Sequence, residues 1–389
     1  MEGLKNMAVG EVCSTISDTY RGNAGMVTLI NTSDVLEGKV LNHERVLNSN
    51  LKGQFKKVFQ KDDILYSEIR PQNKRFAYVD FIPTDYIAST KLMVIRAHVD
   101  KVMPKYLYYF LKSDTTITEL QMLAETRSGT FPQITFTELA NLTIPVPPIP
   151  IQAIIVETLG CIEKKIDYNK QVNDNLYVQA KAIFAQRFID IETIPNGWKK
   201  GNLLDIASYL NGLAMQKYRP NGYEVGLPVL KIKELRQGSC DNSSELCSPN
   251  IKPEYIIHDG DVIFSWSGSL LVDIWCGGTC GLNQHLFKVT SETYDKWFYY
   301  LWTAHHLERF VAIAADKATT MGHIKRGELA KAEVLIPSDE DYKEISSLMN
   351  PICNLIVANR IEARKLAELR NELLPKLMSG EIDVSGIQF

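Results

Sequence analysis

Apolar residues recur every seven positions along two long stretches of the chain, one near its middle and one at its end. This position is filled by Ile155, Ile162, Asn169, Leu176 and Ile183 in the first stretch, and by Ile345, Ile352, Asn359, Leu366 and Leu373 in the second. We call these residues the seam. A position four residues further on is also mostly apolar, and good helix formers occupy much of the remainder. The pattern predicts two long amphipathic helices.

The two helices are expected to pair with each other. A helix of roughly 35 residues is about 50 Å long, which is more than one small domain covers. Either stretch alone is also compatible with the core helix of a globular bundle, but the presence of two favours an antiparallel coiled coil. Asn169 and Asn359 share one seam position, where a buried Asn fixes register, so we expect them to lie close together. Asn173 is an alternative for this role. The other interpretation is that Asn169 and Asn359 point to solvent and fix no register.

Strand-like patterns lie outside the two helical stretches. Runs with strand character cover Asp63–Ile69, Leu92–Ala97, Pro228–Leu235, Asp261–Ser267 and His285–Thr290, and helical runs cover Pro104–Ser113, Thr115–Glu125, Tyr294–Ala304 and His306–Asp316. Proline and glycine clusters at 144–150 and 195–198 mark domain edges. We therefore expect an α+β protein with mixed α/β domains at 1–148 and 195–340, each followed by a long helix, at 149–194 and 341–389.

The two halves of the chain are related by an internal duplication with a period of about 190 residues. Asp63–Ser67 in the first half corresponds to Asp261–Ser265 in the second, and each is an apolar strand that follows an acidic turn. Lys105, Tyr108 and Tyr109 correspond in the same way to Lys296, Tyr299 and Tyr300. Because the order of the matches is preserved, the fold is expected to be a pseudo-two-fold repeat of domain and helix.

Composition is that of an ordinary soluble globular protein. The chain has 389 residues, 45% of them hydrophobic, and 43 Lys and Arg stand against 46 Asp and Glu, for a formal charge of −3. There is no overall basic excess of the kind that indicates a polyanionic partner, so any contact with DNA must depend on local geometry.

The sequence indicates a cytoplasmic location. The start of the chain lacks the apolar segment of a signal peptide. The longest uncharged run, Leu139–Val156, is interrupted by four prolines and does not resemble a membrane span. Seven cysteines without a Cys-x-x-Cys pair are typical of free thiols in a reducing compartment.

No catalytic or metal-binding motif is evident in the sequence. There is no Gly-rich phosphate loop of either common type. Cys276, Cys280 and His285 have the only spacing that suggests zinc, but a closed tetrahedral site needs a fourth ligand and none stands nearby. We therefore expect no catalytic residue and no metal site in this chain.

Polar and basic clusters in both domains are candidates for DNA contact. In the first domain they are Arg70, Asn73, Lys74 and Arg75, and in the second Lys217, Arg219, Lys231, Lys233, Trp266, Ser267, Gln284 and His285. Arg and Lys suit phosphates and guanine, and Gln suits adenine. Taken singly, each such cluster is more often an ordinary solvated surface.

The whole chain resembles the specificity subunit of type I restriction-modification enzymes. The resemblance is carried by Ile144–Pro148 with Gln152, by Ile166-Asp167-x-Asn169 with Leu176, by Phe184 and Phe188, by Gly260–Ser265 and by Leu373–Ile382, in that order. Two departures are Asp62, which stands where the family pattern has Gly, and Pro337–Glu340, which replaces the Pro-Pro-x-x-x-Gln start of the second helix. The first departure leaves the turn geometry at Asp62 open.

The resemblance implies that each globular segment is a target-recognition domain for one half of a split, asymmetric sequence in double-stranded DNA. It also implies that the helices act as a spacer and a platform for two methyltransferase subunits, joined by restriction and translocase subunits. S-adenosylmethionine, ATP and Mg belong to these partners, and the chain itself is expected to be non-catalytic. Three alternatives remain: an enzyme with an unrecognised site, a coiled-coil scaffold that binds proteins but not DNA, and the specificity subunit of a methylation-only system.

Overall fold

The computed structural model of the chain describes residues 3–48, 53–126, 132–316 and 326–386. The chain divides into two compact units. The first unit comprises Met1–Glu163 and Glu368–Phe389, and the second comprises Lys164–Ala367. The units differ from the domains expected above because each one includes part of both long helices, α5 (Ile149–Phe184) and α11 (Asp339–Ser379).

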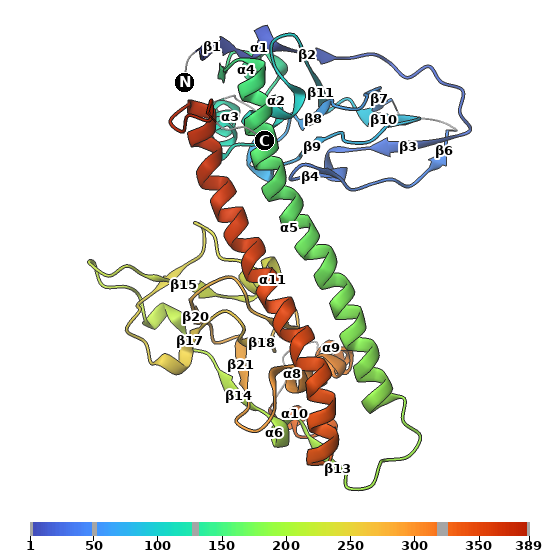
Figure 1. The fold of residues 1–389 in the computed structure, drawn as a ribbon, viewed down its shortest axis with the longest axis vertical. Coiled ribbons are helices and arrows are strands. Elements are labelled where there is room, and N and C mark those ends of the chain that lie inside the picture. Colours follow the sequence, from blue (N-terminus) through green and yellow to red (C-terminus); the bar gives the residue numbers. More distant parts are fainter. Residues whose placement is uncertain (1–2, 49–52, 127–131, 317–325, 387–389) are drawn as a thin grey trace. The chain divides into compact units, whose positions relative to one another are not determined.

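The first unit combines short strands with short helices (Figure 1). Its strands are β1 (Lys5–Ala8), β2 (Cys13–Ile16), β3 (Met26–Ile30), β4 (Val35–Leu36), β5 (Lys39–Val40), β6 (Val46–Leu47), β7 (Phe55–Lys57), β8 (Ile64–Ser67), β9 (Phe76–Tyr78), β10 (Tyr86–Ser89), β11 (Leu92–Ala97) and β12 (Thr143–Val146). Its helices are α1 (Val9–Val12), η1 (Thr32–Asp34), η2 (Pro71–Asn73), α2 (Pro104–Leu111), α3 (Asp114–Glu125) and α4 (Phe136–Ala140), together with the first part of α5 and the last part of α11.

The second unit has a similar composition of elements. Its strands are β13 (Lys199–Asn202), β14 (Ser208–Asn211), β15 (Leu227–Leu230), β16 (Leu246–Cys247), β17 (Ile256–Ile257), β18 (Val262–Ser265), β19 (Leu271–Ile274), β20 (Cys280–Leu282), β21 (Leu286–Thr290) and β22 (Glu333–Ile336). Its helices are η3 (Ala185–Ile189), α6 (Leu203–Ile206), η4 (Met215–Lys217), α7 (Ile232–Gln237), η5 (Pro253–Tyr255), α8 (Lys296–His305), α9 (Leu307–Asp316) and α10 (Arg326–Leu329), with the remainder of α5 and α11.

The two units repeat one sheet topology. The first has the antiparallel order β2-β11-β8-β9 and the second has β14-β21-β18-β19. Each unit also has a parallel strand pair, β3 with β10 and β15 with β20, and a two-stranded sheet that joins its first strand to the strand before a long helix, β1 with β12 and β13 with β22. This correspondence of sheets is the duplication that the sequence predicts.

Most predicted elements of the domains are confirmed, and one is partly wrong. The strand Leu92–Ala97 is observed as β11 with the same bounds. The strand predicted over Pro228–Leu235 ends at Leu230 and is followed by α7. The Glu234 carboxylate accepts a hydrogen bond from the Lys231 backbone N–H, and Gly238 at φ 77° closes the helix, so local capping prevails over the strand-like apolar pattern.

The turn before β8 in the first unit and the turn before β18 in the second have similar backbone geometry despite their different sequences. Asp62 has φ 71° and Gly260 has φ 91°, so both adopt the left-handed conformation. Asp tolerates this region better than most residues, and the Asp62 carboxylate accepts a hydrogen bond from Tyr78 Oη at 2.6 Å. The departure from the family pattern at Asp62 therefore leaves the turn intact.

The two long helices begin in different ways. The fully buried Gln152 near the start of α5 accepts a hydrogen bond from the Met103 N–H and donates to the carbonyls of Lys101 and Pro147. At the start of α11, Ser338 Oγ accepts a hydrogen bond from the Asp341 N–H, and Asp341 accepts another from the indole of Trp198. A serine cap thus replaces the missing Gln at the second helix.

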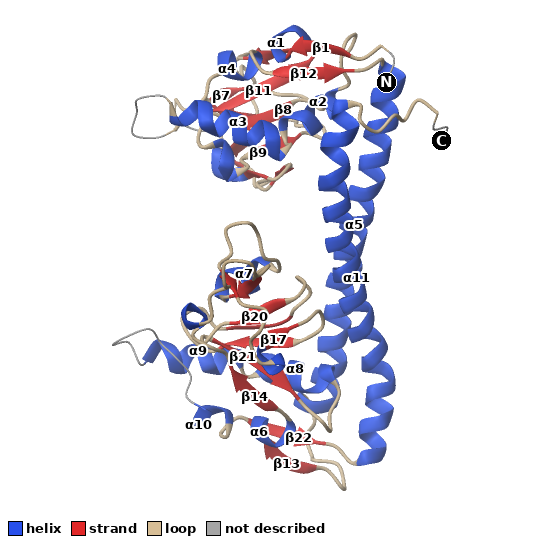
Figure 2. Cartoon of the chain, turned by 90° about the vertical axis from the view of Figure 1, so that its left-hand side faces the viewer, coloured by secondary structure: helices blue, strands red, loops and turns tan. Residues whose placement is uncertain are grey.

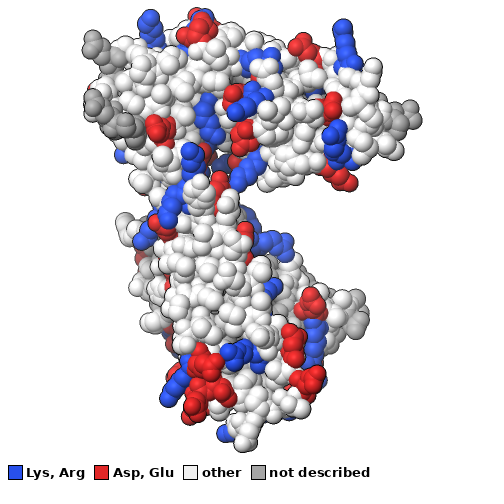
Figure 3. All heavy atoms as spheres, turned by 45° about the vertical axis from the view of Figure 1, so that its right-hand side comes forward, with Lys and Arg blue, Asp and Glu red and all other residues white. Residues whose placement is uncertain are grey.

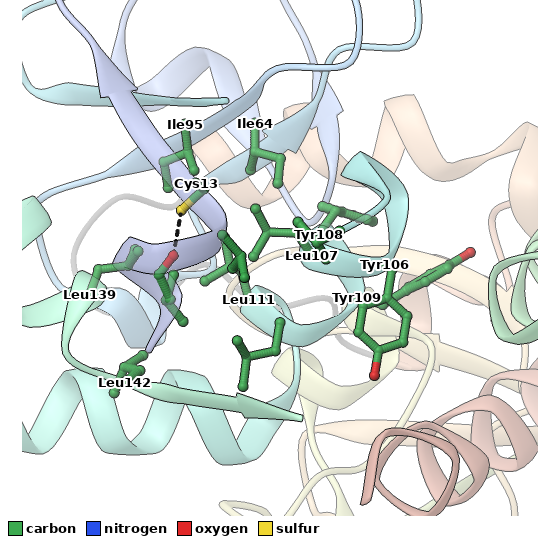
Figure 4. Packing of buried hydrophobic residues seen from close by; sticks show 14 of the residues in the cluster. Cys13, Ile64, Ile95, Tyr106, Leu107, Tyr108, Tyr109, Leu111, Leu139 and Leu142 are labelled. Carbon is green, nitrogen blue, oxygen red and sulfur yellow. Dashed lines mark hydrogen bonds between the residues drawn. The ribbon is translucent and has the colours of Figure 1, made fainter. Parts of the chain in front are cut away.

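Each unit has its own main hydrophobic core, and each core includes both long helices. In the first unit the core contains Ile155 and Leu159 of α5 and Leu374 and Leu377 of α11, and Figure 4 shows the part around Cys13, Ile64 and Tyr106. In the second unit Ala180 and Phe184 of α5 share a core with Ile345, Met349 and Cys353 of α11. None of the helices described is both long and apolar enough to cross a membrane.

Candidate nucleic-acid interface

The basic candidates of the first unit lie in the hairpin loop between β8 and β9. Arg70 and Lys74 flank η2, and both have left-handed backbone conformations, at φ 45° and 51°. Pro71 between them is buried, and the backbone N–H of Gln72 donates to the buried Gln121 side chain of α3 at 3.2 Å. The loop is therefore held in one strained shape with Arg70, Gln72 and Asn73 exposed.

Two of these candidates are engaged within the protein. Lys74 forms an ion pair with Asp114 at 3.1 Å, and Arg75 donates to the backbone carbonyls of Ser33 and Val35. Arg75 therefore holds the β8–β9 hairpin against η1 and β4. Of the first-unit candidates, Arg70 and Asn73 have the exposure that a base contact requires.

The corresponding loop of the second unit, between β18 and β19, carries Trp266 and Ser267. The Trp266 indole N–H donates to Asn211 at 3.0 Å, and its ring lies 5.6 Å from that of Phe287. Ser267 is 5% exposed, and its backbone carbonyl accepts a hydrogen bond from Ser265 Oγ. Trp266 is thus half-buried against Phe287, whereas Ser267 is buried.

Gln284 and His285 lie beside Trp266. The rings of Trp266 and His285 are 6.3 Å apart, and Gln284 Nε2 is 3.4 Å from His285 Nε2. His285 Nδ1 is buried and has no hydrogen-bond partner among the described residues. The sequence indicated Trp266, Gln284 and His285 as candidates, but from two separate segments and without placing them together. The exposed Asn211, which completes the cluster, was missed because only its position at the end of β14, next to β21, would have indicated it.

The other basic candidates of the second unit lie mostly in ion pairs. Glu245 forms ion pairs with Lys231, at 2.5 Å, and with Arg219, at 3.1 Å. These contacts lower the pKa of Glu245, and the hydrogen bond from Lys231 has the largest effect. Lys233 pairs with Asp241 at 3.5 Å. Lys217 is exposed at the end of η4.

Surface charge is of mixed sign. On the face drawn in Figure 3, Lys and Arg are scattered among Asp and Glu and do not form a broad patch of one sign. This distribution agrees with the small net charge of the sequence. Binding to a polyanion would therefore depend on individual placed side chains.

The cysteines do not form a metal site among the described residues. No cluster of three or more His, Cys, Asp or Glu that could hold a metal occurs in that part of the chain. Cys276 and Cys280 are buried, and burial raises the pKa of Cys276 to about 11, which disfavours the thiolate that zinc needs. The zinc spacing noted in the sequence therefore gains no support.

Every seam residue of the two helices is buried or half-buried. Ile155, Asn169 and Ile345 are buried, and Ile162, Leu176, Ile183, Ile352, Asn359, Leu366 and Leu373 are half-buried. In the second unit α5 and α11 lie side by side (Figure 2). Their order is antiparallel, because Lys165 pairs with Glu362 whereas Asn173 further along α5 contacts Ile356 earlier in α11.

Three asparagines connect these two helices. Asn169 Nδ2 donates to Glu362 at 2.7 Å and to the Asn359 carbonyl at 3.4 Å. Asn359 Nδ2 donates to Asn173 Oδ1 at 2.9 Å, and Asn173 Nδ2 donates to the Ile356 carbonyl at 3.0 Å. Asn169 and Asn359 thus lie next to each other, and Asn173 takes part in the same network. These bonds can form at only one register of the pair.

Asn169→Asp is expected to destabilise the second unit by about 1 to 3 kcal/mol at pH 7.5. Asn169 is 4% exposed, and the substitution puts a buried carboxylate beside Glu362 in place of a donor. The pKa of the new Asp would be raised, so the loss should shrink as the pH falls through that raised value. Urea unfolding followed by tryptophan fluorescence measures this, because all five tryptophans lie in the second unit.

Glu362→Gln in the Asn169→Asp background removes the repulsion and provides the control. Stability should recover in part in this double variant, with a weaker dependence on pH, because burial alone then raises the pKa of the new Asp. An Asn169→Asp variant as stable as the parent at pH 7.5 would contradict the observed network.

Comparison with known proteins gives consistent matches over the whole chain. Residues 1–177 and 195–371 match the family model described as type I restriction modification DNA specificity domain. The chain is 26% identical over 460 residues to the type I restriction enzyme HindI specificity subunit of Haemophilus influenzae, across 98% of this chain and 100% of that protein. It is 26% identical over 313 residues to the type I restriction enzyme MjaIX specificity subunit of Methanocaldococcus jannaschii, across 73% of this chain and 70% of that protein.

A solved structure has the same fold. The crystal structure of the type I restriction-modification system S subunit from M. genitalium aligns with 96% of this chain and 96% of its own, with a TM-score of 0.56 and 13% sequence identity. The two matched segments of the family model each cover one mixed α/β domain and most of the long helix that follows it.

Proposed function

Because the chain belongs to the family of type I restriction-modification DNA specificity proteins, we propose that each of its two mixed α/β domains recognises one half of a bipartite DNA sequence. The observation that carries this proposal is the duplicated topology. One sheet order occurs twice, and in each copy a hairpin loop with polar side chains follows the strand that ends in Ser67 or Ser265.

The two half-sites should differ in sequence. The first domain presents Arg70, Gln72 and Asn73 on its hairpin loop, and the second presents Trp266 with Gln284 and His285 beside it. Basic and amide side chains recognise different base edges from aromatic ones. An asymmetric site follows from two copies of one fold with different side chains at the recognition surface.

The long helices are proposed to form an antiparallel coiled coil that sets the spacing between the half-sites. The asparagine network and the buried or half-buried seam support this role, because they define one register for the pair. Two domains that enter the major groove on one face of the duplex need to engage it about 34 Å apart, or at a multiple of that distance. The lengths of α5 and α11 would then determine the number of base pairs between the half-sites.

The helices are also proposed to bind two methyltransferase subunits, which in turn recruit restriction and translocase subunits. Tyr168, Val172 and Val178 on α5, and Leu348 and Leu355 on α11, are apolar and exposed, as expected of a protein-binding surface. S-adenosylmethionine, ATP and Mg would be bound by those partners. The chain itself would contribute recognition and no catalysis. Partner subunits could also supply phosphate contacts that this nearly neutral chain lacks.

Exchange of one domain tests the proposal. Residues 1–148 are replaced by the corresponding segment of another family member, since the junction falls between β12 and α5 and leaves both elements whole. Sequencing of the methylated sites in cells that also express the methyltransferase subunits should show a change in one half of the recognised sequence and an unchanged second half and spacing. A change in both halves, or in neither, would contradict the proposal.

A further inference from the structure

The register of the sheets identifies two pairs of equivalent surface positions. In the first domain Ser67 pairs with Leu92, and in the second Ser265 pairs with Leu286. The next backbone hydrogen bond is also the same: the Glu68 N–H donates to the Lys91 carbonyl at 3.1 Å, and the Trp266 N–H donates to the His285 carbonyl at 3.4 Å. Glu68 with Lys91 therefore occupies the place that Trp266 with His285 occupies in the other copy.

We propose that these two pairs specify one base pair in each half of the DNA site. The inference rests on the proposed function and adds to it the residues that make the two halves different. At this shared position one domain carries an ion pair and the other carries two aromatic rings.

The pair in the first domain suits a G·C base pair. Lys91 Nζ lies 3.4 Å from Glu68 Oε2 and 3.4 Å from Gln133 Oε1, and the Lys91 side chain is 51% exposed. An ammonium group donates well to guanine O6 and N7, and a carboxylate accepts from cytosine N4. Together, Lys91 thus offers a donor for the guanine and Glu68 an acceptor for the cytosine of one base pair.

The pair in the second domain suits an A·T base pair. Trp266 is oriented by its hydrogen bond to Asn211 and by contact with Phe287, so its apolar ring is fixed. Beside His285 stands the half-buried Gln284, whose amide can donate to adenine N7 and accept from adenine N6. A fixed apolar ring next to an amide matches the thymine methyl group next to adenine.

Both pairs are rigidly placed, as base recognition requires. Ser67 Oγ accepts a hydrogen bond from the Ile69 N–H at 3.1 Å, and Ser265 Oγ donates to the Ser269 carbonyl at 2.9 Å. Each serine therefore ties its strand end to its own hairpin loop. An isolated bridge between Ile69 and Gln133 further fixes the first loop.

The test in the first domain uses Glu68→Lys together with Lys91→Glu, which keeps an ion pair while reversing its direction. The full chain is expressed with its methyltransferase subunits, and its methylated sites are sequenced. Preference for G·C at one position of the first half should fall by about 10- to 100-fold, the discrimination that one good base contact provides, and the second half should be unchanged. Arg45 with Asp85 is a matched control, because it is an ion pair in the same unit with a separation of 3.5 Å and exposures of 52% and 27%, against 51% and 22% for Lys91 and Glu68.

The test in the second domain installs the first-domain pair through Trp266→Glu with His285→Lys, and preference at one position of the second half should move from A·T to G·C. Trp266→Phe with Gln284→Glu retains ring packing on Phe287 and removes the amide that recognises adenine, so it serves if the first variant does not fold. It should lower the A·T preference at the same position by a similar factor. Tryptophan fluorescence and circular dichroism establish that each variant is folded.

The outcomes separate this inference from the proposed function. A parent complex that methylates no bipartite sequence contradicts the proposed function itself. A parent complex with a bipartite site, whose folded variants keep the parent preference at every position, contradicts only the inference. The inference is also contradicted if reversing the Arg45–Asp85 control pair alters recognition of the first half-site as strongly as reversing Glu68 and Lys91.

Discussion

Glu163→Ala is expected to lower the free energy of unfolding of the first unit by about 3 to 5 kcal/mol at pH 7, the usual loss when one partner of a buried ion pair is removed. Glu163 of α5 contacts Lys112 Nζ, the residue that follows α2, and accepts a hydrogen bond from Tyr109 Oη at 2.9 Å. The Lys112 side chain is only 11% exposed. Urea unfolding followed by circular dichroism measures the loss, because the tryptophans report on the second unit.

The pH dependence of this pair follows from its pKa shifts. Burial would raise the pKa of Glu163, but Lys112 outweighs burial and the pKa is lowered, so its contribution to stability exists above its ordinary pKa and disappears as the pH falls through the lowered one. Burial lowers the pKa of Lys112 to about 8. The buried cation opposes folding below that value and ceases to do so as the pH rises toward 10.5. In Glu163→Ala the pKa of Lys112 falls further, so the difference from the parent should be largest near pH 7 and decrease toward pH 10.

Lys112→Met combined with Glu163→Leu is the control. Removal of both charges leaves no buried ion without a partner, so this double variant should be within about 1 kcal/mol of the parent, or more stable than it. If Glu163→Ala alone costs less than about 1 kcal/mol, α2 and α5 are not joined by a buried pair in solution.

Phe264→Ala is expected to destabilise the second unit by about 3 to 5 kcal/mol. Phe264 lies in β18, is fully buried, and its ring is 5.8 Å from that of Phe310, 6.2 Å from that of Phe287 and 6.4 Å from that of Tyr209. Truncation leaves a cavity beside the strand that ends at Ser265, immediately before Trp266. The urea transition observed by tryptophan fluorescence should move to lower urea, and sequence discrimination in the second half should weaken with it.

Tyr66→Phe, at the equivalent position of the first unit, is expected to increase stability. Tyr66 precedes Ser67 as Phe264 precedes Ser265, and its hydroxyl is buried without a hydrogen-bond partner among the described residues. Removing an unpaired buried hydroxyl should stabilise the first unit by about 1 kcal/mol. A loss of stability in Tyr66→Phe would show that the hydroxyl has a partner, such as a water molecule.

Local patterns in the sequence predicted the regular elements and the duplication well. The seven-residue repeat located α5 and α11, and the apolar run at Leu92–Ala97 located β11, because both signals depend on neighbours along the chain. The error at Pro228–Leu235 has the same origin: an apolar run does not distinguish a strand from a strand followed by a capped turn of helix.

The candidate interface was predictable only in part, because side-chain availability depends on contacts between distant segments. Arg75 is basic and lies on a loop, but carbonyls about 40 residues earlier in the chain hold its guanidinium. Asn211 gave no signal of its own, and only the pairing of β14 with β21 places it near Trp266. The Arg360 and Asp273 ion pair, which joins α11 to β19 at 2.7 Å, was likewise invisible to pattern analysis.

The small sheets at the domain edges bear on how such proteins diversify. β1 pairs with β12 and β13 pairs with β22, so in each case the chain enters and leaves its domain through adjacent strands. A gene segment that encodes everything between two such strands can be replaced by recombination without altering the path of the polypeptide on either side. Recombination between alleles could then combine the domains of existing proteins, because each exchanged segment begins and ends at a paired strand.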